Sequence, residues 1–240
     1  MCKDETTGTQ SVLDSPTGAP YDVSGRRVPF LFMSELRPVI VDYGAGNLRS
    51  VVNAVRRAGA EPLVSGVASD ITRAPAVILP GVGAAACVVE GLSEHGLKGA
   101  LLDFIALGKP FLGICLGLQA LFDATEEGGD YSCLGVVAGR VKRFAHGLKV
   151  PHIGWNQVRQ RGAHPIFADV ADGAAFYFVH SYYTVPDDSS LVIGETDYGA
   201  SFCSVLARNN LVATQFHPEK SGPDGLKIYA NFLKMVGATC

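Results

Sequence analysis

An alternation of short apolar runs with segments of helical periodicity is the sequence feature that most restricts the fold of this chain. Residues 38–42 form a short, mostly apolar run, as in a strand that is covered on both faces. Apolar residues then recur at helical spacing from Leu48 to Ala58, where Gly59 follows as a stop signal. The same patterns predict strands at residues 62–65, 76–79 and 111–114 and a helix at residues 97–107. This alternation predicts an α/β domain whose central, mostly parallel sheet has helices on both faces.

The second half of the chain is richer in short strand-like runs, which favour additional antiparallel ribbons. These runs lie at residues 136–144, 174–179, 191–195, 203–207 and 211–216. A final helix is predicted where apolar residues from Leu226 to Val236 share one stripe. The sequence contains no internal repeat, so we expect one domain over residues 37–240.

The N-terminal extension, residues 1–36, differs in composition from the rest of the chain. Between Met1 and Pro29, 13 positions are Gly, Pro, Ser or Thr, and large aliphatic residues are nearly absent. Such a segment buries too little apolar surface to fold, so we expect it to be disordered and assign it no function. It lacks the apolar core of a secretory signal, and its acidic residues argue against an organellar transit peptide.

The charge and hydropathy of the chain exclude several classes of partner. Twenty Lys and Arg residues stand against 23 Asp and Glu residues, which gives a net charge of -3. This balance provides no basic field for a nucleic acid or an anionic membrane. The longest apolar stretches, such as residues 100–107, are too short to span a bilayer. We therefore expect no nucleic-acid partner and no membrane insertion.

The cysteines carry no metal-site pattern. They occupy positions 2, 87, 115, 133, 203 and 240, without a CxxC pair or a Cys and His cluster at zinc-site spacing. A domain of this size can form its core without disulfides, so the reducing cytoplasm is the expected location. Each cysteine is then interpreted alone, and a small buried hydrophobe is the default.

Two glycine-rich loops follow predicted strands, at residues 44–47 and 80–83. Gly81, Gly83 and Ala86 fit the permissive dinucleotide-binding pattern G-x-G-x-x-A. That pattern also requires the first strand of a βαβ unit and an acidic residue at a strand end about 20 positions later. The chain is predicted to be helical at that position, so we expect no nucleotide cofactor.

A third loop, at residues 111–119, has the G-x-C-x-G form of a nucleophile elbow centred on Cys115. Small residues on both sides allow a sharp turn that lifts the central side chain clear of the sheet. At the start of the following helix, the thiol would meet the positive end of the helix dipole, which favours a reactive thiolate. The next N–H, from Leu116, would point to a developing oxyanion. The alternative is a buried cysteine in a tight strand-to-helix turn.

His217 and Glu219 lie in a second stretch that could complete such a site. A thiolate nucleophile needs a base and a group that orients this base. Residues i and i+2 of an extended chain point to the same face, so the Glu219 carboxylate could hold one ring nitrogen of His217. Pro218 cannot donate to a sheet ladder and therefore marks a strand end. The alternative is a surface His and Glu in a turn.

Together these segments resemble the class I glutamine amidotransferases, a family with a Cys-His-Glu triad in this order. Further segments make the similarity more specific: DYGAGNLRS at residues 42–50, LPGVG at 79–83, HIGWN at 152–156, FVHSY at 178–182 and HPEKS at 217–221. They resemble the branch formed by the glutaminase subunits of imidazole glycerol phosphate synthases. The similarity covers residues 38–235. Leu118, where Met is commoner, and residues 84–87 depart from its pattern.

The resemblance implies hydrolysis of glutamine to glutamate and ammonia without a metal or a cofactor. Cys115 would attack the side-chain amide to form a glutamyl thioester. His217 would give a proton to the leaving ammonia and then activate water, while Glu219 fixes the imidazole tautomer.

The resemblance also assigns binding roles to residues around the triad. The oxyanion would be bound by the N–H of Leu116 and by a peptide in the loop formed by Gly81, Val82 and Gly83. The positions that hold the amino-acid end of the substrate correspond to Gln119, Ser181 and Tyr182. For Ser181 and Tyr182, the alternative is that they are strand residues that pack beside the site.

A partner follows from the same resemblance: a cyclase subunit that uses the ammonia to make imidazole glycerol phosphate and AICAR in histidine biosynthesis. In the family this subunit is a (β/α)8 barrel, which these 240 residues do not contain, so we expect a heterodimer of separate chains. The expected docking face includes Asn47, Trp155, Tyr177 and Lys220. For Trp155 the alternative is a core aromatic residue.

Two other kinds of function stay open from the sequence. The first is a glutaminase that serves another synthase, such as one that makes pyridoxal phosphate, GMP or carbamoyl phosphate. The second lies outside the amidotransferases and is either a thiol hydrolase or an inert binding module that carries triad residues. Activation by the matching synthase distinguishes a glutaminase of another synthase from the expected function. Glutamate release in the presence of the cyclase distinguishes the expected function from a thiol hydrolase or a binding module.

Overall fold

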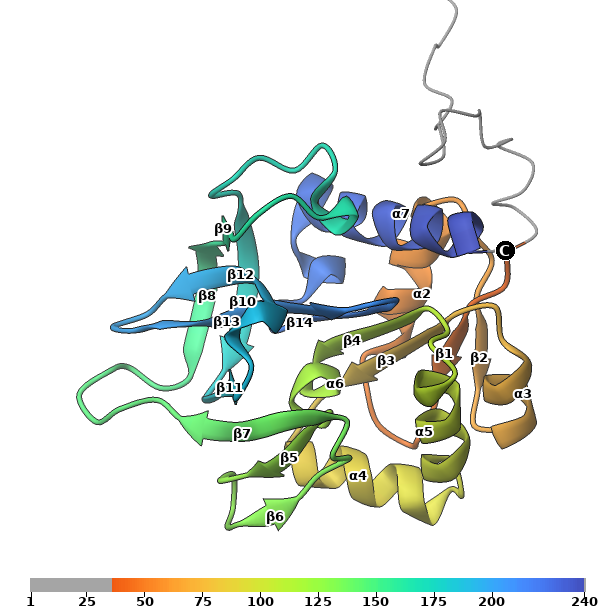
Figure 1. Ribbon diagram of the computed structural model, residues 1–240, viewed down its shortest axis with the longest axis horizontal. Helices are drawn as coiled ribbons and strands as arrows, with labels where there is room; N and C mark the ends of the chain where they lie inside the picture. Colours follow the sequence, from red (N-terminus) through yellow and green to blue (C-terminus); the bar gives the residue numbers. More distant parts are fainter. Residues whose placement is uncertain (1–35, 240) are drawn as a thin grey trace, which may run out of the picture.

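The computed structural model describes residues 36–239, which form a central sheet covered by helices on both faces (Figure 1). Helices α2 (Leu48–Arg57) and α7 (Gly222–Thr239) cover one face, and the other carries α3 (Ala68–Arg73), α4 (Ala85–Glu94) and α5 (Lys98–Ala106). This arrangement confirms the predicted α/β class. Most of the N-terminal extension lies outside the described residues, so the expectation that it is disordered concerns residues that the structure does not describe. Leu36, at the predicted boundary, is only 6% exposed and packs in the core.

The first half of the chain follows the predicted alternation. Its strands are β1 (Val39–Val41), β2 (Leu63–Ser65), β3 (Val77–Gly81) and β4 (Phe111–Cys115), and the single-turn helix α6 (Leu116–Gln119) follows β4. Two of its helices, α3 and α4, were not predicted. Helix α3 has six residues, too few for a periodic pattern. Helix α4 contains Gly91, a residue that in a sequence indicates a helix break. In the structure this glycine makes room for Tyr43, because a Cβ on Gly91 would lie 2.8 Å from the Tyr43 ring.

The second half supplies strands and short turns. They are β5 (Phe122–Thr125), β6 (Tyr131–Ser132), β7 (Val137–Arg143), β8 (His152–Gln157), β9 (Arg159–Gln160), η1 (Pro165–Phe167), β10 (Ala175–His180), β11 (Tyr182–Pro186), η2 (Ser189–Leu191), β12 (Val192–Asp197), β13 (Ser201–Arg208), β14 (Leu211–Thr214) and η3 (Pro218–Lys220). The five predicted strands are confirmed, whereas β5, β6, β8, β9 and β11 are additional. Strand β8 alternates mostly exposed with less exposed residues, but its buried end is a histidine, so its sequence lacks an apolar alternation.

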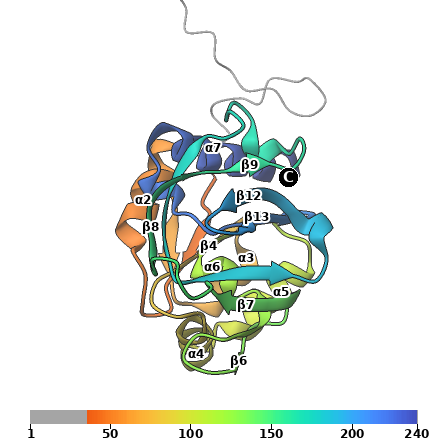
Figure 2. The ribbon, with the colours of Figure 1, turned by 90° about the vertical axis from the view of Figure 1, so that its left-hand side faces the viewer.

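The strands join into two sheets. The large sheet has the order β2-β1-β3-β4-β14-β13-β11-β7-β5-β6, with β12 and β9 beside β13. Its first five strands pair in parallel, and the pairings of β13 with β14, β12 and β11 are antiparallel. Strands β8 and β10 form a separate antiparallel pair. The antiparallel strands of the second half face the viewer in Figure 2.

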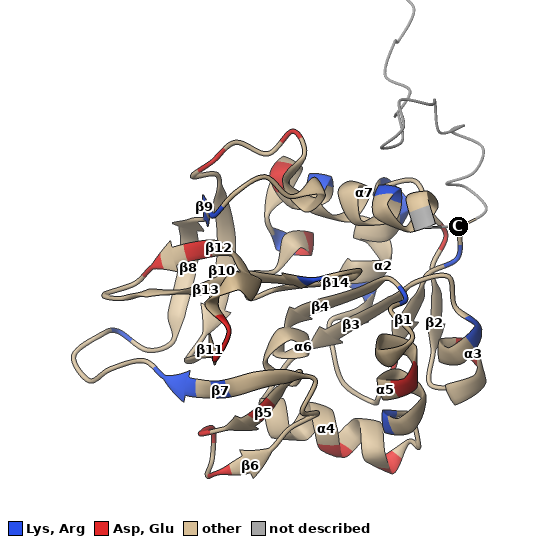
Figure 3. Cartoon of the chain, viewed as in Figure 1, with Lys and Arg blue, Asp and Glu red and all other residues tan. Residues whose placement is uncertain are grey.

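The parallel part of the sheet determines where the functional loops meet. Gly81 at the end of β3 is the register partner of Cys115 at the end of β4. Strand β14 lies on the other side of β4 and leads through Phe216 into His217. Loops at the carboxyl ends of adjacent parallel strands lie side by side, which brings three candidate segments to one edge. Figure 3 marks acidic and basic residues along both halves of the described chain.

Candidate active site

Cys115 sits in a sharp turn between β4 and α6, as the elbow pattern predicts. Its φ of 55° and ψ of -103° are unusual for a residue with a side chain. The flanking glycines leave room for this turn. A Cβ on Gly117 would lie 2.0 Å from the Leu79 carbonyl oxygen, and one on Gly113 would lie 2.8 Å from the Gly117 oxygen. The strained turn is therefore possible only with these two glycines.

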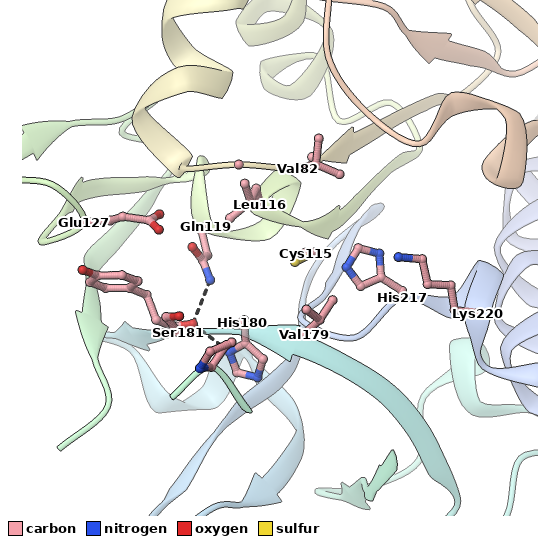
Figure 4. Close-up of a pocket in the computed structure, with 14 residues that line it drawn as sticks. Val82, Cys115, Leu116, Gln119, Glu127, Val179, His180, Ser181, His217 and Lys220 are labelled. Carbon is pink, nitrogen blue, oxygen red and sulfur yellow. Dashed lines mark hydrogen bonds between the residues drawn. The ribbon is translucent and has the colours of Figure 1, made fainter. Parts of the chain in front are cut away.

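The helix that follows Cys115 is a single turn. Helix α6 covers four residues, Leu116–Gln119. A single turn carries only a small part of the dipole of a longer helix. The main electrostatic partner of the Cys115 thiol is therefore His217, whose imidazole faces the sulfur in Figure 4.

His217 and Glu219 are in contact, as predicted, but by a different local structure. The His217 Nδ1 and Glu219 Oε1 atoms are 2.8 Å apart. An extended segment was expected to align the two side chains, whereas Pro218 begins the 3-10 turn η3 directly after His217. Their side chains are only 5% and 2% exposed, which excludes the alternative of a surface pair. Tyr229, whose hydroxyl lies 3.5 Å from Glu219 Oε2, covers the carboxylate from α7.

The surroundings of His217 favour its protonated form. Burial alone would lower the pKa of His217, but hydrogen bonds and charges from Cys115 and Glu219 outweigh it and raise the pKa to about 9. Three backbone and hydroxyl contacts fix its position. The His217 N–H donates to the Tyr177 carbonyl at 3.0 Å, and Ser221 Oγ donates to the His217 carbonyl at 2.7 Å while accepting from the Tyr177 N–H. A thiol and an imidazolium held this way can act as nucleophile and acid.

The predicted oxyanion residues gather beside Cys115. Gly81 packs so closely on α6 that a Cβ there would lie 2.5 Å from the Leu116 Cβ. Val82 is 39% exposed and lines the pocket above the thiol (Figure 4). Gly83 has a φ of 94°, in the region that favours glycine. The loop and the first peptide of α6 thus border the same space.

The predicted substrate residue Gln119 has a fixed amide. Its Nε2 donates to the Tyr182 carbonyl at 2.9 Å and to Gln215 Oε1 at 3.0 Å. Its Oε1 is buried and has no hydrogen-bond partner among the described residues. Gln215 was missed by the sequence analysis, although it stands two positions before His217; its Nε2 lies 3.6 Å from Cys115 Sγ. The two amides thus connect the thiol to the wall of the pocket.

A pocket of about 330 Å³ opens over these residues. Its lining is formed by Gly81, Val82, Gly83, Cys115, Leu116, Gln119, Glu127, Pro151, Val179, His180, Ser181, Tyr182, His217 and Lys220. Ser181 and Tyr182 therefore border the cavity, and Tyr182 also contributes its carbonyl to Gln119.

Glu127 is a pocket residue that sequence reasoning missed. In the sequence it belongs to an acidic, glycine-rich turn, which carries no signal of function. Its Oε2 accepts from the Ala85 N–H at the start of α4, at 3.3 Å. Burial raises its pKa, although the Ala85 N–H acts in the opposite direction. The structure thus places one carboxylate on the pocket wall that also carries Gln119 (Figure 4).

Of the predicted docking residues, Lys220 also lines the pocket, whereas Asn47, Trp155 and Tyr177 are not part of its lining. Trp155 is 58% exposed, which excludes the alternative of a core aromatic. Its ring contacts Tyr177 edge-on at 6.4 Å, and Lys220 Nζ lies 5.8 Å from the centre of the Tyr177 ring. Asn47 directly precedes α2, which packs against η3, the turn that carries Lys220. The structure therefore groups three of these residues closely and places the fourth at the adjoining helix start.

Two features are absent from residues 36–239. No cluster of three His, Cys, Asp or Glu side chains in this range could hold a metal ion. No helix in this range is long and apolar enough to cross a membrane.

Comparison with known proteins identifies the family. The model of the family "Glutamine amidotransferase class-I" matches residues 39–236. The imidazole glycerol phosphate synthase subunit HisH of Dehalococcoides mccartyi (strain CBDB1) is 53% identical over 196 residues, which cover 82% of this chain and 96% of that protein. The subunit of the same name from Moorella thermoacetica is 48% identical over 202 residues, covering 84% and 96%. A solved structure, "Crystal structure of glutamine amidotransferase", has the same fold at 19% identity, with a TM-score of 0.66 and coverage of 83% and 98%. The chain belongs to the class I glutamine amidotransferase family.

Proposed function

We propose that this chain is the glutaminase subunit of an imidazole glycerol phosphate synthase in histidine biosynthesis. It hydrolyses glutamine to glutamate and ammonia, and a cyclase subunit uses the ammonia to make imidazole glycerol phosphate and AICAR. The observation that carries the proposal is the convergence of Cys115, His217 and Glu219 beside one pocket. The names of the similar proteins support this synthase over the others considered.

In the first half-reaction, the Cys115 thiolate attacks the side-chain carbonyl carbon of glutamine, and an electron pair moves to the carbonyl oxygen. His217 is protonated because its neighbours raise its pKa to about 9, and it donates this proton to the amide nitrogen. The C–N bond then breaks. Ammonia leaves, and a glutamyl thioester remains on Cys115.

In the second half-reaction, neutral His217 takes a proton from water, and the resulting hydroxide attacks the thioester carbonyl. The C–S bond breaks, glutamate leaves, and the thiolate and imidazolium are restored. Glu219 accepts from Nδ1 at 2.8 Å, which keeps the other ring nitrogen directed at the reacting atoms.

The tetrahedral intermediates need N–H donors for their oxyanion. Leu116 supplies one, since it directly follows the nucleophile. The loop of Gly81, Val82 and Gly83 supplies the other, since Gly81 is the register partner of Cys115. Gly83 allows a peptide of this loop to turn inward at little steric cost.

The pocket wall opposite the triad suits the amino-acid end of glutamine. Gln119 Oε1 is buried and unpaired, and Glu127 adds a carboxylate to the same pocket. Both atoms are acceptors, so we assign them to the α-ammonium group. Ser181 and Tyr182 border the pocket beside Gln119 and are assigned to the α-carboxylate end.

A partner subunit is required by the chemistry of the product. Ammonia that escapes into water is protonated and loses its nucleophilicity, so it must pass directly to the acceptor. Trp155 and Lys220 are exposed and both lie against the half-buried ring of Tyr177, with Asn47 near this group. We propose this surface as the docking face for the cyclase subunit, in a heterodimer.

The test is reconstitution. The purified chain is mixed with a cyclase subunit and its nucleotide substrate, and product formation is followed with glutamine or with ammonium salts. We expect both nitrogen sources to support synthesis, with glutamine requiring this chain. Activation instead by a synthase for pyridoxal phosphate, GMP or carbamoyl phosphate would reassign the partner. Glutamate release that no synthase changes would favour a thiol hydrolase, and no release at all would favour a binding module.

The remaining expectations concern the extent and location of the domain. We propose residues 37–240 as the amidotransferase domain and the cytoplasm as its location. The described cysteines, Cys87, Cys115, Cys133 and Cys203, are all free thiols, as in a reducing compartment.

A shortened chain that starts at Met33 tests the domain boundary. It should keep its melting temperature and glutaminase activity, because the removed residues have little apolar surface to bury. The measurement is thermal unfolding beside the full chain, and a fall of several degrees would contradict the boundary.

A further inference from the structure

Two buried histidines outside the triad form a hydrogen-bonded pair. His152 Nδ1 and His180 Nε2 are 3.0 Å apart, and the residues face each other across the β8 and β10 ladder. They are only 4% and 5% exposed. Further along β8, Ile153 and Trp155 are 59% and 58% exposed. Strand β8 therefore carries both Trp155 of the proposed docking face and a buried histidine near the pocket.

The hydrogen bond between Asn156 and His152 can run in only one direction. Asn156 Oδ1 accepts from the Gln157 N–H at 2.8 Å, so its Nδ2 is the atom that faces the Asp197 carbonyl at 2.9 Å and His152 Nε2 at 3.3 Å. A side-chain NH2 group only donates. His152 Nε2 must therefore accept.

The same reasoning fixes the inner end. A neutral imidazole whose Nε2 accepts carries its proton on Nδ1, so His152 donates to His180 Nε2. His180 then carries its own proton on Nδ1 and donates to the Tyr182 carbonyl at 2.8 Å. We call Asn156, His152 and His180, linked in this direction, the histidine chain.

The histidine chain holds together only while both imidazoles are neutral. A further proton on either ring would place one N–H against another. The surroundings agree with this condition. Burial lowers the pKa of His152 to about 4, and burial also lowers that of His180 to about 3, against the raising effect of the Tyr182 carbonyl.

The histidine chain ends at an atom that the substrate residues share. The Tyr182 carbonyl accepts from His180 and also from Gln119 Nε2. Gln119 Nε2 further donates to Gln215, whose own Nε2 faces Cys115 Sγ. These contacts direct Gln119 Nε2 away from the cavity and leave its Oε1 as the unpaired acceptor.

We propose that Asn156, His152 and His180 are positioning residues for glutamine. The histidine chain fixes the Tyr182 carbonyl, and thereby the Gln119 amide, from the strand that carries Trp155. The inference rests on the proposed glutaminase function. It adds a route by which strand β8 bears on substrate affinity while the triad is left unchanged.

The kinetic test uses the full chain with the cyclase subunit and varied L-glutamine. His152→Leu and His180→Leu should each raise the KM for glutamine at least about tenfold, the size expected for a lost buried hydrogen bond. The kcat and the ammonium-dependent rate should change less than about threefold, because the residues do not touch the reacting atoms. His180→Asn keeps an N–H near the Nδ1 position and should recover most of the affinity.

Phe202→Leu is the matched control. The Phe202 ring packs 5.2 Å from His180 and 6.1 Å from His152 without a hydrogen bond to either. The Phe202→Leu substitution alters packing alone and should leave the KM for glutamine within about twofold of that of the unmodified chain. An equal KM rise in Phe202→Leu, or an unchanged KM in both histidine variants, would overturn the inference.

A second measurement does not depend on activity and is read from the unmodified chain. The ring nitrogens of His152 and His180 are examined by 15N NMR in the unmodified chain, with the variants used for assignment. Both should be neutral with the proton on Nδ1. An Nε2-protonated tautomer on either ring would refute the histidine chain. Absence of glutaminase activity in the unmodified complex would instead refute the proposed function, whatever the tautomers show.

Discussion

His217 on one side of the pocket and the pair His152 and His180 on the other are buried to the same degree, with 4 to 5% exposure, yet they differ in charge. The pKa of His217 is raised to about 9, whereas burial lowers those of His152 and His180 to about 4 and about 3. Burial disfavours the imidazolium in all three. Only His217 contacts a carboxylate, that of Glu219, with the reactive sulfur of Cys115 as its other partner, so its charge is compensated. The partners, not the depth of burial, decide which histidine takes part in acid and base chemistry.

The largest expected effect comes from removing the partner that reacts. Cys115→Ala should abolish glutamine-dependent synthesis, with a loss of at least about 1,000-fold, because no thioester can form. Glutamate release is the measurement. Ammonium-dependent synthesis by the cyclase in the same complex is the control and should persist. Retained glutamine hydrolysis would show that another residue is the nucleophile.

A smaller loss is expected from neutralising the other partner of His217. Glu219→Gln should lower glutaminase kcat about 100-fold, because the amide neither compensates the imidazolium nor fixes its tautomer. The pKa of His217 should fall from about 9 toward its ordinary value. The pH profile of kcat measures both changes. An unaltered profile would mean that Glu219 is not what separates His217 from the other two histidines.

The low pKa of His180 also predicts a loss of stability at acidic pH. In the unfolded chain His180 takes up a proton below its ordinary pKa of about 6.5, whereas in the folded chain its pKa is about 3. Between these two pH values the unfolded state binds more protons, so the free energy of unfolding falls as the pH falls. At pH 5 the cost is about 2 kcal/mol, from about 1.4 kcal/mol per pH unit. Urea unfolding at pH 7.5 and 5 is the measurement. In the unmodified chain His152 adds to the loss and His217, whose pKa is raised, opposes it, so the test is the difference: His180→Leu should lose about 2 kcal/mol less than the unmodified chain. Equal losses would show that His180 does not stay neutral.

The smallest expected effect concerns the surface next to His217. We expect the cyclase with its ligand bound to activate glutamine hydrolysis about 100-fold, and Lys220→Ala to reduce this activation about tenfold with little change in glutamine affinity. Lys220 follows Glu219 in η3, so docking at its ammonium group would reach the triad directly. Lys109→Ala, at the amino end of β4, is the control. Equal activation in both variants would argue against this route.

Much of the fold and the triad could be predicted from local patterns. The first-half strands have apolar runs, and Cys115 lies between two glycines that its turn requires. Strand β8 escaped prediction because its buried end is a histidine satisfied by a partner on another strand. Glu127 and Gln215 acquire their roles only through tertiary contacts, with Ala85 and with Cys115. Pairings of this kind leave no periodic trace in a single sequence.

The histidine chain also bears on where protons can travel. A proton wire needs a group that releases a proton at one end and a group that accepts it at the other. Here both ends are peptide carbonyls, those of Asp197 and Tyr182, which do neither near neutral pH. The histidine chain therefore does not conduct protons between strand β8 and the pocket. Proton exchange in the pocket is left to His217, Glu127 and water, and the histidine chain supplies no acid that could convert ammonia to ammonium before it leaves.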